Sequence, residues 1–164
     1  MSTRVATTAD LSAIADIYAH YVVNSVASFE LEAPAAAEWQ TRFAKVAAAG
    51  LPFLVVERDG RVAGYAYCLP WKARPAYQGT VEDSIYLAPW ATGQGAGSEL
   101  LRALLEASRA AGVREVIAVI ADSGDPSSIA LHKKLGFDDA GRLRKVGHKH
   151  GRDIDTVLLQ CSLR

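Results

Sequence analysis

A short glycine-rich run at residues 93–98 constrains this chain most, because it separates a β-like segment ending near Leu87 from a strongly amphipathic segment. Glycines let the backbone turn tightly and approach a ligand, and the unpaired N–H groups that open the following helix attract an anion. The run therefore predicts a phosphate site rather than a tight turn alone. Its candidate contacts are Gly93, Gln94, Gly95, Ala96, Gly97 and Ser98.

The segment after the run has the spacing of a surface helix, because its leucines recur at three- and four-residue intervals from Leu100 to Leu105. Gly112 is a typical residue to end such a helix. Two common nucleotide loops are excluded here. The order G-x-G-x-G lacks the lysine of a P-loop and does not fit the dinucleotide pattern G-x-G-x-x-G.

Length and charge limit the function further. A chain of 164 residues, half of them hydrophobic, suits a single domain over 1–164. Lys plus Arg and Asp plus Glu both number 18, so bulk charge gives no reason to expect nucleic acid as a partner. The start lacks a signal-peptide core and the longest apolar stretch, 116–121, is too short to span a bilayer. We expect a cytoplasmic protein without a membrane partner.

Turn signals and hydrophobic periodicity predict an alternating series of elements. Asp10 is expected to cap a first helix, a second helix follows Pro34, and Asp59-Gly60 joins two antiparallel strands at 53–57 and 62–69. The remaining predicted elements are a strand at 81–87, the amphipathic helix, a fully buried strand at 116–121, a short helix at 127–135, and strands at 137–146 and 154–163. With a first short strand near Val5, this order predicts an α/β fold with a mixed central sheet flanked by helices.

The glycine run resembles the acetyl-CoA loop of the GNAT superfamily of N-acetyltransferases, whose pattern is Gln/Arg-x-x-Gly-x-Gly/Ala. Gly95 and Gly97 match the two small positions, and Thr92 stands where the family usually has Gln or Arg. The predicted order of elements is also similar to the GNAT order over nearly the whole chain. The resemblance implies the GNAT acyl-CoA N-acyltransferase fold and acetyl-CoA as cofactor.

Four separated blocks are similar to the branch of this superfamily that N-acetylates phosphinothricin and methionine sulfoximine. They are NSVASFE at 24–30, WKARPAYQGTVEDSIYL at 71–87, SIALHKKLGF at 128–137 and VGHKHGRDID at 146–155. The resemblance implies an enzyme that acetylates the α-amine of a small amino-acid analogue, in a detoxifying role. It also implies a homodimer.

Two residues are candidates for proton transfer. Glu82 matches the family's glutamate on the strand before the glycine run, which implies a general base acting directly or through a water. His132 stands where many GNAT enzymes have a tyrosine that protonates the leaving thiolate, and an imidazole can donate a proton near neutral pH. Without the resemblance, Glu82 would be a solvated charge and His132 a helix-face residue.

The resemblance implies further cofactor contacts beyond the glycine run. Ile85, Tyr86 and Leu87 would line the acetyl and pantetheine end, with the Leu87 N–H facing the thioester oxygen. Asp125 and Ser128 would touch the cofactor as well, although related proteins usually carry asparagine at the first position. A capping role for Asp125 on the short helix is the alternative, because ionised aspartate only accepts hydrogen bonds.

For the amine substrate, Lys72 and Arg74 beside Tyr77 supply positive charge suited to a carboxylate or phosphinate. Phe29 would pack on the substrate side chain, and Glu30, like Glu82, would attract its ammonium group. The alternative for the two cations is a solvated surface role.

Other readings remain open at this point. The pair His148 and His150 invites a metal interpretation, but no third ligand has a clear place, so we expect no metal. Cys68 and Cys161 lack the setting of a nucleophile, which favours direct attack by the amine. Alternative functions are acetylation of a polyamine, an aminoglycoside or a protein N-terminus, and a non-catalytic acyl-CoA-binding sensor.

Overall fold

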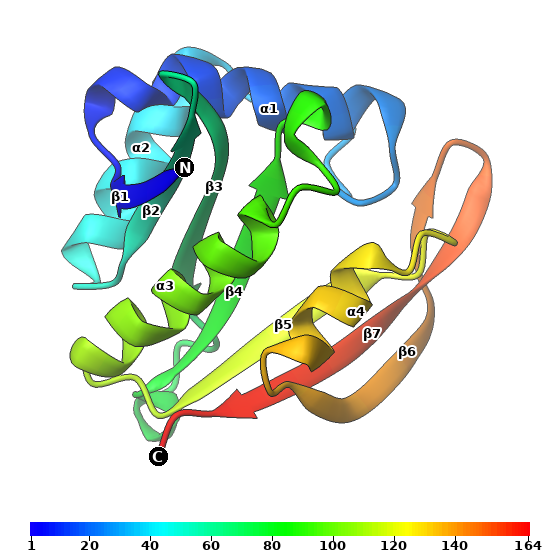
Figure 1. The fold of residues 1–164 in the computed structure, drawn as a ribbon. Coiled ribbons are helices and arrows are strands. Elements are labelled where there is room, and N and C mark those ends of the chain that lie inside the picture. The colour runs from blue at the N-terminus through cyan, green and yellow to red at the C-terminus, as the bar shows by residue number, and fades with distance from the viewer.

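One seven-stranded sheet organises the chain in this computed structural model, which describes residues 1–164. The strand order is β1-β2-β3-β4-β5-β7-β6, and every neighbouring pair is antiparallel except β4–β5. The strands are β1 Ser2–Val5, β2 Phe53–Arg58, β3 Arg61–Pro70, β4 Thr80–Leu87, β5 Glu115–Ala121, β6 Asp138–Lys149 and β7 Arg152–Ser162. The helices are α1 Leu11–Asn24, α2 Ala36–Ala48, α3 Ala96–Ala110 and α4 Ser127–Lys134. Figure 1 shows this arrangement.

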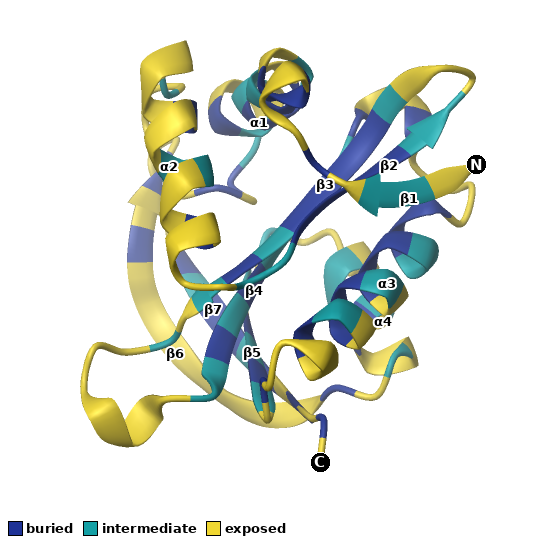
Figure 2. Cartoon of the chain, turned by 90° about the vertical axis from the view of Figure 1, so that its left-hand side faces the viewer, coloured by how far each residue is buried: buried dark blue, intermediate teal, exposed yellow.

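Helices cover both faces of the sheet. Figure 2 shows α1 and α2 on one side and α3 and α4 on the other. On the α1/α2 side, Tyr18 and Tyr65 both contact Trp39 edge-on, with ring centroids 5.5 and 5.7 Å apart. On the α3 side, Leu100, Leu101 and Leu104 are fully buried, as their helical spacing predicts. No helix of the structure has the length and apolar character needed to cross a membrane.

The central strands β4 and β5 separate after a short parallel contact. Their register holds only for Thr80 with Glu115, Val81 with Val116 and Glu82 with Ile117. Beyond this point β4 stays paired with β3 as far as Leu87, while β5 stays paired with β7 as far as Ala121. The sheet therefore opens into a gap between β4 and β5, which is visible between the green and yellow strands in Figure 1.

Local turn signals are confirmed where the chain must reverse. Asp59 and Gly60 both have positive φ, at 53° and 73°, which is the geometry that makes Asp-Gly a two-residue hairpin turn. Helix α1 differs from the prediction in how it begins. Asp10 precedes Leu11, but its carboxylate does not cap α1; it accepts the backbone N–H of Thr7 at 2.8 Å and pairs with Arg4. The cap belongs to a preceding 3-10 turn, Thr8–Asp10.

Two strand predictions need correction. The apolar run in β5 is not buried on both faces, because only Val116 and Ala118 are buried and Val119 is 36% exposed. The second half of the strand, residues 118–121, lines the gap instead of packing under a second layer. Strands β6 and β7 are also longer than predicted, because they continue to a tight turn at His150-Gly151, where both residues have positive φ.

Candidate active site

The gap between β4 and β5 is a cleft of about 420 Å³ that reaches from the middle of the sheet to the glycine run. One wall is β4 and the other is β5 with α4, so both halves of the sheet contribute. Of the residues predicted from the sequence, those lining it are Glu82, Ile85, Tyr86, Leu87, Gly93, Gly95, Gly97, Ser98, Asp125, Ser128 and His132. The cleft therefore brings together residues that lie up to 50 positions apart in the sequence.

The glycines before α3 serve two different physical purposes. Gly93 and Gly95 have φ of 72° and 86°, and a Cβ at either would meet nothing within 4 Å. These positions need glycine for backbone conformation alone. Gly97 has ordinary helical geometry, but its Cβ would stand 3.2 Å from the Leu131 side chain and 3.4 Å from that of Leu87. It permits close packing of α3 against both walls of the cleft.

The first turn of α3 presents free backbone donors. Glu99 is the first residue to bond backward, to the Gly95 carbonyl at 3.2 Å, so the N–H groups of Ala96, Gly97 and Ser98 have no backbone partner. Together with the helix dipole they make an anion site. Lys134 of α4 adds charge, because its Nζ lies 3.4 Å from the Ser98 hydroxyl.

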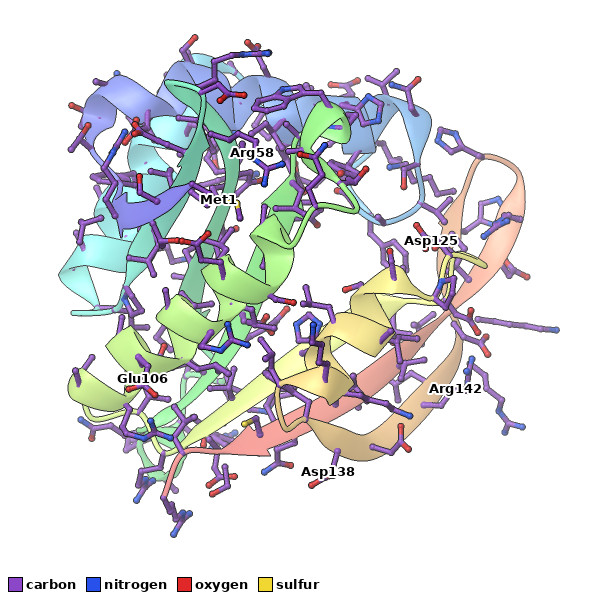
Figure 3. All side chains as sticks on the ribbon, viewed as in Figure 1. Met1, Arg58, Glu106, Asp125, Asp138 and Arg142 are labelled. Atoms are coloured by element: carbon purple, nitrogen blue, oxygen red, sulfur yellow. The ribbon has the colours of Figure 1, made fainter.

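Two members of the run face away from the cleft. Ala96 is fully buried in the core. The side-chain amide of Gln94 donates to the Trp90 carbonyl at 3.1 Å, while the backbone carbonyl of Gln94 accepts a 3.3 Å hydrogen bond from Arg58. Figure 3 shows Arg58 beside the loop that leads into α3. The side chains of Gln94 and Ala96 therefore shape the loop, and its ligand-facing groups are backbone donors.

The end of β4 turns backbone groups into the cleft. Ala88 donates to the Ala63 carbonyl of β3 at 2.8 Å, and alternation along the strand turns the N–H of Leu87 the other way, toward the gap. The Leu87 carbonyl points the same way, since it accepts the Tyr21 hydroxyl of α1. The strand thus presents a donor where β5 has already diverged.

Glu82 stands at the point where the two strands part. It is the last residue of β4 in register with β5, and it is half-buried. Burial raises the pKa of its carboxyl group, the charge of Asp83 raises that pKa further, and Lys72 opposes the shift. An elevated carboxyl pKa improves the ability of Glu82 to accept a proton from an amine.

His132 is fixed by two short hydrogen bonds. Its Nε2 lies 2.7 Å from Oδ2 of Asp83, and its Nδ1 lies 2.7 Å from the backbone carbonyl of Ser128. Both side chains are buried, at 3% exposure for His132 and 1% for Asp83, and the Phe137 ring packs edge-on against the imidazole. Burial lowers the pKa of His132, but the hydrogen bond and charge of Asp83 outweigh it, so the pKa is raised.

Asp125 and Ser128 lie where α4 begins at the mouth of the cleft. Figure 3 shows Asp125 on the α4 side of the opening, across from Arg58. The Asp125 carboxylate accepts the Ser127 N–H at 3.0 Å, which is the capping contact that the sequence left as an alternative. Because Asp125 also lines the cleft, the cap does not remove it from the site.

Apart from Glu82, the predicted substrate residues lie outside the cleft lining. Lys72, Arg74 and Tyr77 are exposed on the loop between β3 and β4. Phe29 lies on the opposite side, against Gly147 of β6, where a Cβ would stand 2.5 Å from its ring. Glu30 is engaged by Arg42 of α2 at 2.6 Å. Phe29 and Glu30 thus belong to the loop between α1 and α2, whereas the cationic residues belong to the loop between β3 and β4.

The histidine pair and the cysteines lie elsewhere. His148 pairs with Asp153 at 2.9 Å, and His150 lies in the β6–β7 turn, so the two histidines do not lie on one face of a strand. No group of three or more His, Cys, Asp or Glu side chains is arranged to hold a metal ion. Cys68 and Cys161 are free, buried thiols, and burial raises the pKa of Cys68 to about 12.

Sequence reasoning missed two residues of the site. Asp83 is not among the predicted site residues, yet strand alternation places it on the face of β4 opposite to Glu82. Tyr21 is the second such residue, and nothing in the sequence indicates its contact with Leu87.

The chain matches the model of the Acetyltransferase (GNAT) domain over residues 3–158. It is 49% identical over 160 residues to the phosphinothricin N-acetyltransferase of Alcaligenes faecalis, covering 98% of this chain and 81% of that protein. It is 39% identical over 163 residues to the L-methionine sulfoximine/L-methionine sulfone acetyltransferase of Pseudomonas paraeruginosa, covering 99% and 94%.

A solved structure shares the whole fold. It is a crystal structure of a GNAT superfamily phosphinothricin acetyltransferase from Sinorhizobium meliloti in complex with AcCoA. The likeness has a TM-score of 0.93 at 44% sequence identity, and it covers 99% of this chain and 88% of the other.

Proposed function

Because this chain belongs to the GNAT family of acetyltransferases, we propose that its cleft transfers the acetyl group of acetyl-CoA to the α-amine of phosphinothricin, methionine sulfoximine or a similar amino-acid analogue. The observation that carries the proposal is the divergence of β4 from β5 immediately after Glu82, with unpaired backbone donors at the far end of the gap. We propose that the whole chain, 1–164, acts as one such domain in detoxification.

The residues at the cleft suit acetyl-CoA, which supplies an activated acetyl group as a thioester. The free N–H groups at the start of α3 suit a pyrophosphate, and the positive charge of Lys134 lies beside them. The Leu87 N–H would face the thioester oxygen as negative charge develops there. Thr92 lines the cleft without the longer donor side chain of the family's usual Gln or Arg, so backbone donors carry more of the contact.

Glu82 acts as general base in this proposal. An α-amine with a pKa near 8 is only about a tenth neutral at pH 7, a deficit of roughly 1.4 kcal/mol. The raised pKa of the Glu82 carboxyl supports acceptance of the amine proton, directly or through a water. Alignment of the amine with the thioester contributes more, up to roughly 7–11 kcal/mol.

His132 acts as the acid for the leaving sulfur. When the C–S bond breaks, sulfur keeps the electron pair, and a proton from the imidazolium converts the thiolate to a thiol. Glu82 then releases the amine proton to solvent, and His132 regains one from solvent, so the cycle balances. The position of His132 on the cleft wall supports this role.

The exposed loop bearing Lys72, Arg74 and Tyr77 is proposed to bind the acidic end of the amino-acid analogue. Its positive charge suits a carboxylate or phosphinate and disfavours a cationic polyamine or aminoglycoside. Lys72 is near enough to influence the Glu82 carboxyl, which supports a place beside the reacting amine. Phe29 and Glu30 would border the other side of the same substrate.

We also propose a cytoplasmic homodimer. The unpaired thiols Cys68 and Cys161 support a reducing compartment. Strand β6 is an edge strand that is exposed along most of its length, as Figure 2 shows, and Leu143 and Val146 on it are 48% and 57% exposed. An edge of this kind requires cover or protection, which a second copy would provide.

The test is thiol release from acetyl-CoA with phosphinothricin, methionine sulfoximine, ordinary amino acids, a polyamine, an aminoglycoside and a peptide with a free N-terminus. We expect release with the first two, and its near loss in Glu82→Gln. The matched control is Glu106→Gln, which changes an exposed glutamate at the far end of α3. Release only with another amine would overturn the substrate, and binding of acetyl-CoA without release to any amine would favour the sensor.

A further inference from the structure

Asp83 is the most deeply buried carboxylate at the cleft, and the proposed mechanism gives it no part. Its Oδ2 lies 2.7 Å from His132 Nε2, and its Oδ1 is buried without any hydrogen-bond partner. An ionised carboxylate in such a place is costly unless a positive charge faces it. The positions of the protons on Asp83 and His132 therefore decide whether the buried carboxylate faces a positive charge.

The contacts of His132 determine its proton positions. The Ser128 carbonyl can only accept, so Nδ1 must carry a hydrogen. The second nitrogen, Nε2, faces Asp83, which means that one further proton lies between these two atoms. With that proton on Nε2, the ring is an imidazolium that donates from both nitrogens, and Asp83 is its counter-ion.

We propose that Asp83 is a positioning residue that holds the imidazole of His132 in place and keeps it doubly protonated at the cleft wall. This inference rests on the proposed acid role of His132. The leaving sulfur then meets a positive charge that stabilises the thiolate, and the Nε2 hydrogen leaves its bond to Asp83 when it protonates the sulfur. Without the carboxylate, the buried ring would be neutral, with its one hydrogen committed to Ser128.

No other charge near His132 provides this control. Lys133 and Lys134, on the same helix, point to Asp139 and Ser98. Glu82 lies on the opposite face of β4 from Asp83. The remaining titratable groups near the pair are the thiols Cys68 of β3 and Cys161 of β7, which stay neutral because burial raises the pKa of each. Cys68 is the β3 partner of Asp83, so it faces the pair directly.

The experiment measures the pKa of His132 by NMR of histidine-labelled protein, with the His132 signal assigned from its loss in His132→Gln. In Asp83→Asn we expect that pKa to fall by about 1 to 3 units, because a facing carboxylate shifts its partner by that amount. The control is Asp139→Asn, which removes an exposed carboxylate beside the same helix and should leave the His132 signal unmoved. An unchanged His132 pKa in Asp83→Asn overturns the proposal.

Kinetics supply the second measurement. The pH at which kcat falls on the alkaline side should move down in Asp83→Asn, and the same change should have no further effect once His132 is Gln. Additive losses in the double variant would contradict a role exerted through His132. If Asp83→Asn fails to fold, Asp83→Ser removes the same charge with a smaller side chain. Because the NMR titration needs no turnover, an inactive enzyme would contradict the proposed function and leave the Asp83–His132 result readable.

Discussion

The ammonium group of Lys149 donates a 2.7 Å hydrogen bond to the backbone carbonyl of Ser28, a residue 121 positions away in the chain. Lys149 is only 3% exposed, so the contact is made without competition from solvent. It fastens the loop between α1 and α2, which carries Phe29 and Glu30, to the end of β6. Burial lowers the pKa of Lys149, which is the direction expected for a desolvated ammonium group.

Lys149→Met should loosen this loop. The substitution keeps the length of the side chain but leaves the Ser28 carbonyl without its donor, which costs about 1–3 kcal/mol. We expect a higher KM for the amine substrate with an unchanged KM for acetyl-CoA, and a lower free energy of unfolding in urea. Lys45→Met, at an exposed position of α2, is the control. Equal effects on both KM values would contradict a role confined to the substrate loop.

The charge of Lys72 should affect the pKa of Glu82 as well as the binding of the substrate. The Lys72 charge opposes the upward shift in the pKa of Glu82, so Lys72→Met should raise that pKa further. Activity requires ionised Glu82, and the acidic limb of the kcat/KM profile should therefore move to higher pH. Lys72→Arg preserves the charge and should leave that limb in place. A shift of equal size in both variants would indicate that charge is not the cause.

Gly95 belongs to the proposed acetyl-CoA loop, and Gly50, which follows α2, is a matched control for it. Both have positive φ, 86° and 68°, and a Cβ at either would meet nothing within 4 Å. Replacement by Ala should cost each about 1–2 kcal/mol of stability, because the left-handed conformation is strained with a Cβ. Only Gly95→Ala should also weaken acetyl-CoA binding measured by calorimetry. Loss of binding in Gly50→Ala would point to a general effect of destabilisation.

Asp10 should contribute stability that depends on pH. The hydrogen bond from Arg4 lowers the pKa of the Asp10 carboxyl below its ordinary value, against the opposing effect of burial. A carboxyl with a lowered folded pKa stabilises above its unfolded pKa of about 3.9, and this stabilisation is lost as pH falls through the folded pKa. Asp10→Ala should therefore cost about 1–2 kcal/mol at pH 7. The gap between variant and parent in urea unfolding should narrow below pH 4, and a constant gap would argue against a charge effect.

Features that depend only on neighbouring residues could be predicted from the sequence. Asp59-Gly60 predicted its turn, because both positions need positive φ, and the leucine spacing predicted which face of α3 is buried. The position of Gly93 and Gly95 before that helix also predicted the free donors of the cleft. Each of these depends on one short stretch of successive residues, so no tertiary contact was needed.

Contacts set by tertiary arrangement were beyond the sequence. His132 contacts Asp83, which lies 49 positions earlier in the chain. Asp10 accepts hydrogen bonds from Thr7 and Arg4 and does not cap α1, because β1 places Arg4 beside it. The apolar run of β5 predicted burial on both faces, but hydrophobicity does not distinguish a packed layer from a ligand cleft. Such outcomes depend on strand register, which a single sequence does not reveal.

The three residue pairs that join β4 to β5 are the only backbone ladder between the two halves of the sheet. A molecule bound in the cleft beyond these pairs contacts Leu87 on one half and residues 118–121 on the other. It therefore connects the two halves beside the short contact between β4 and β5. By thermodynamic linkage, local opening of the contact between β4 and β5 becomes rarer by the factor 1 + [L]/Kd, where [L] is the ligand concentration, when the ligand binds only the closed form. Amide hydrogen exchange at Glu115 and Ile117, whose N–H groups face β4, should therefore slow in proportion to acetyl-CoA concentration, so that the contact between β4 and β5 reports cofactor occupancy.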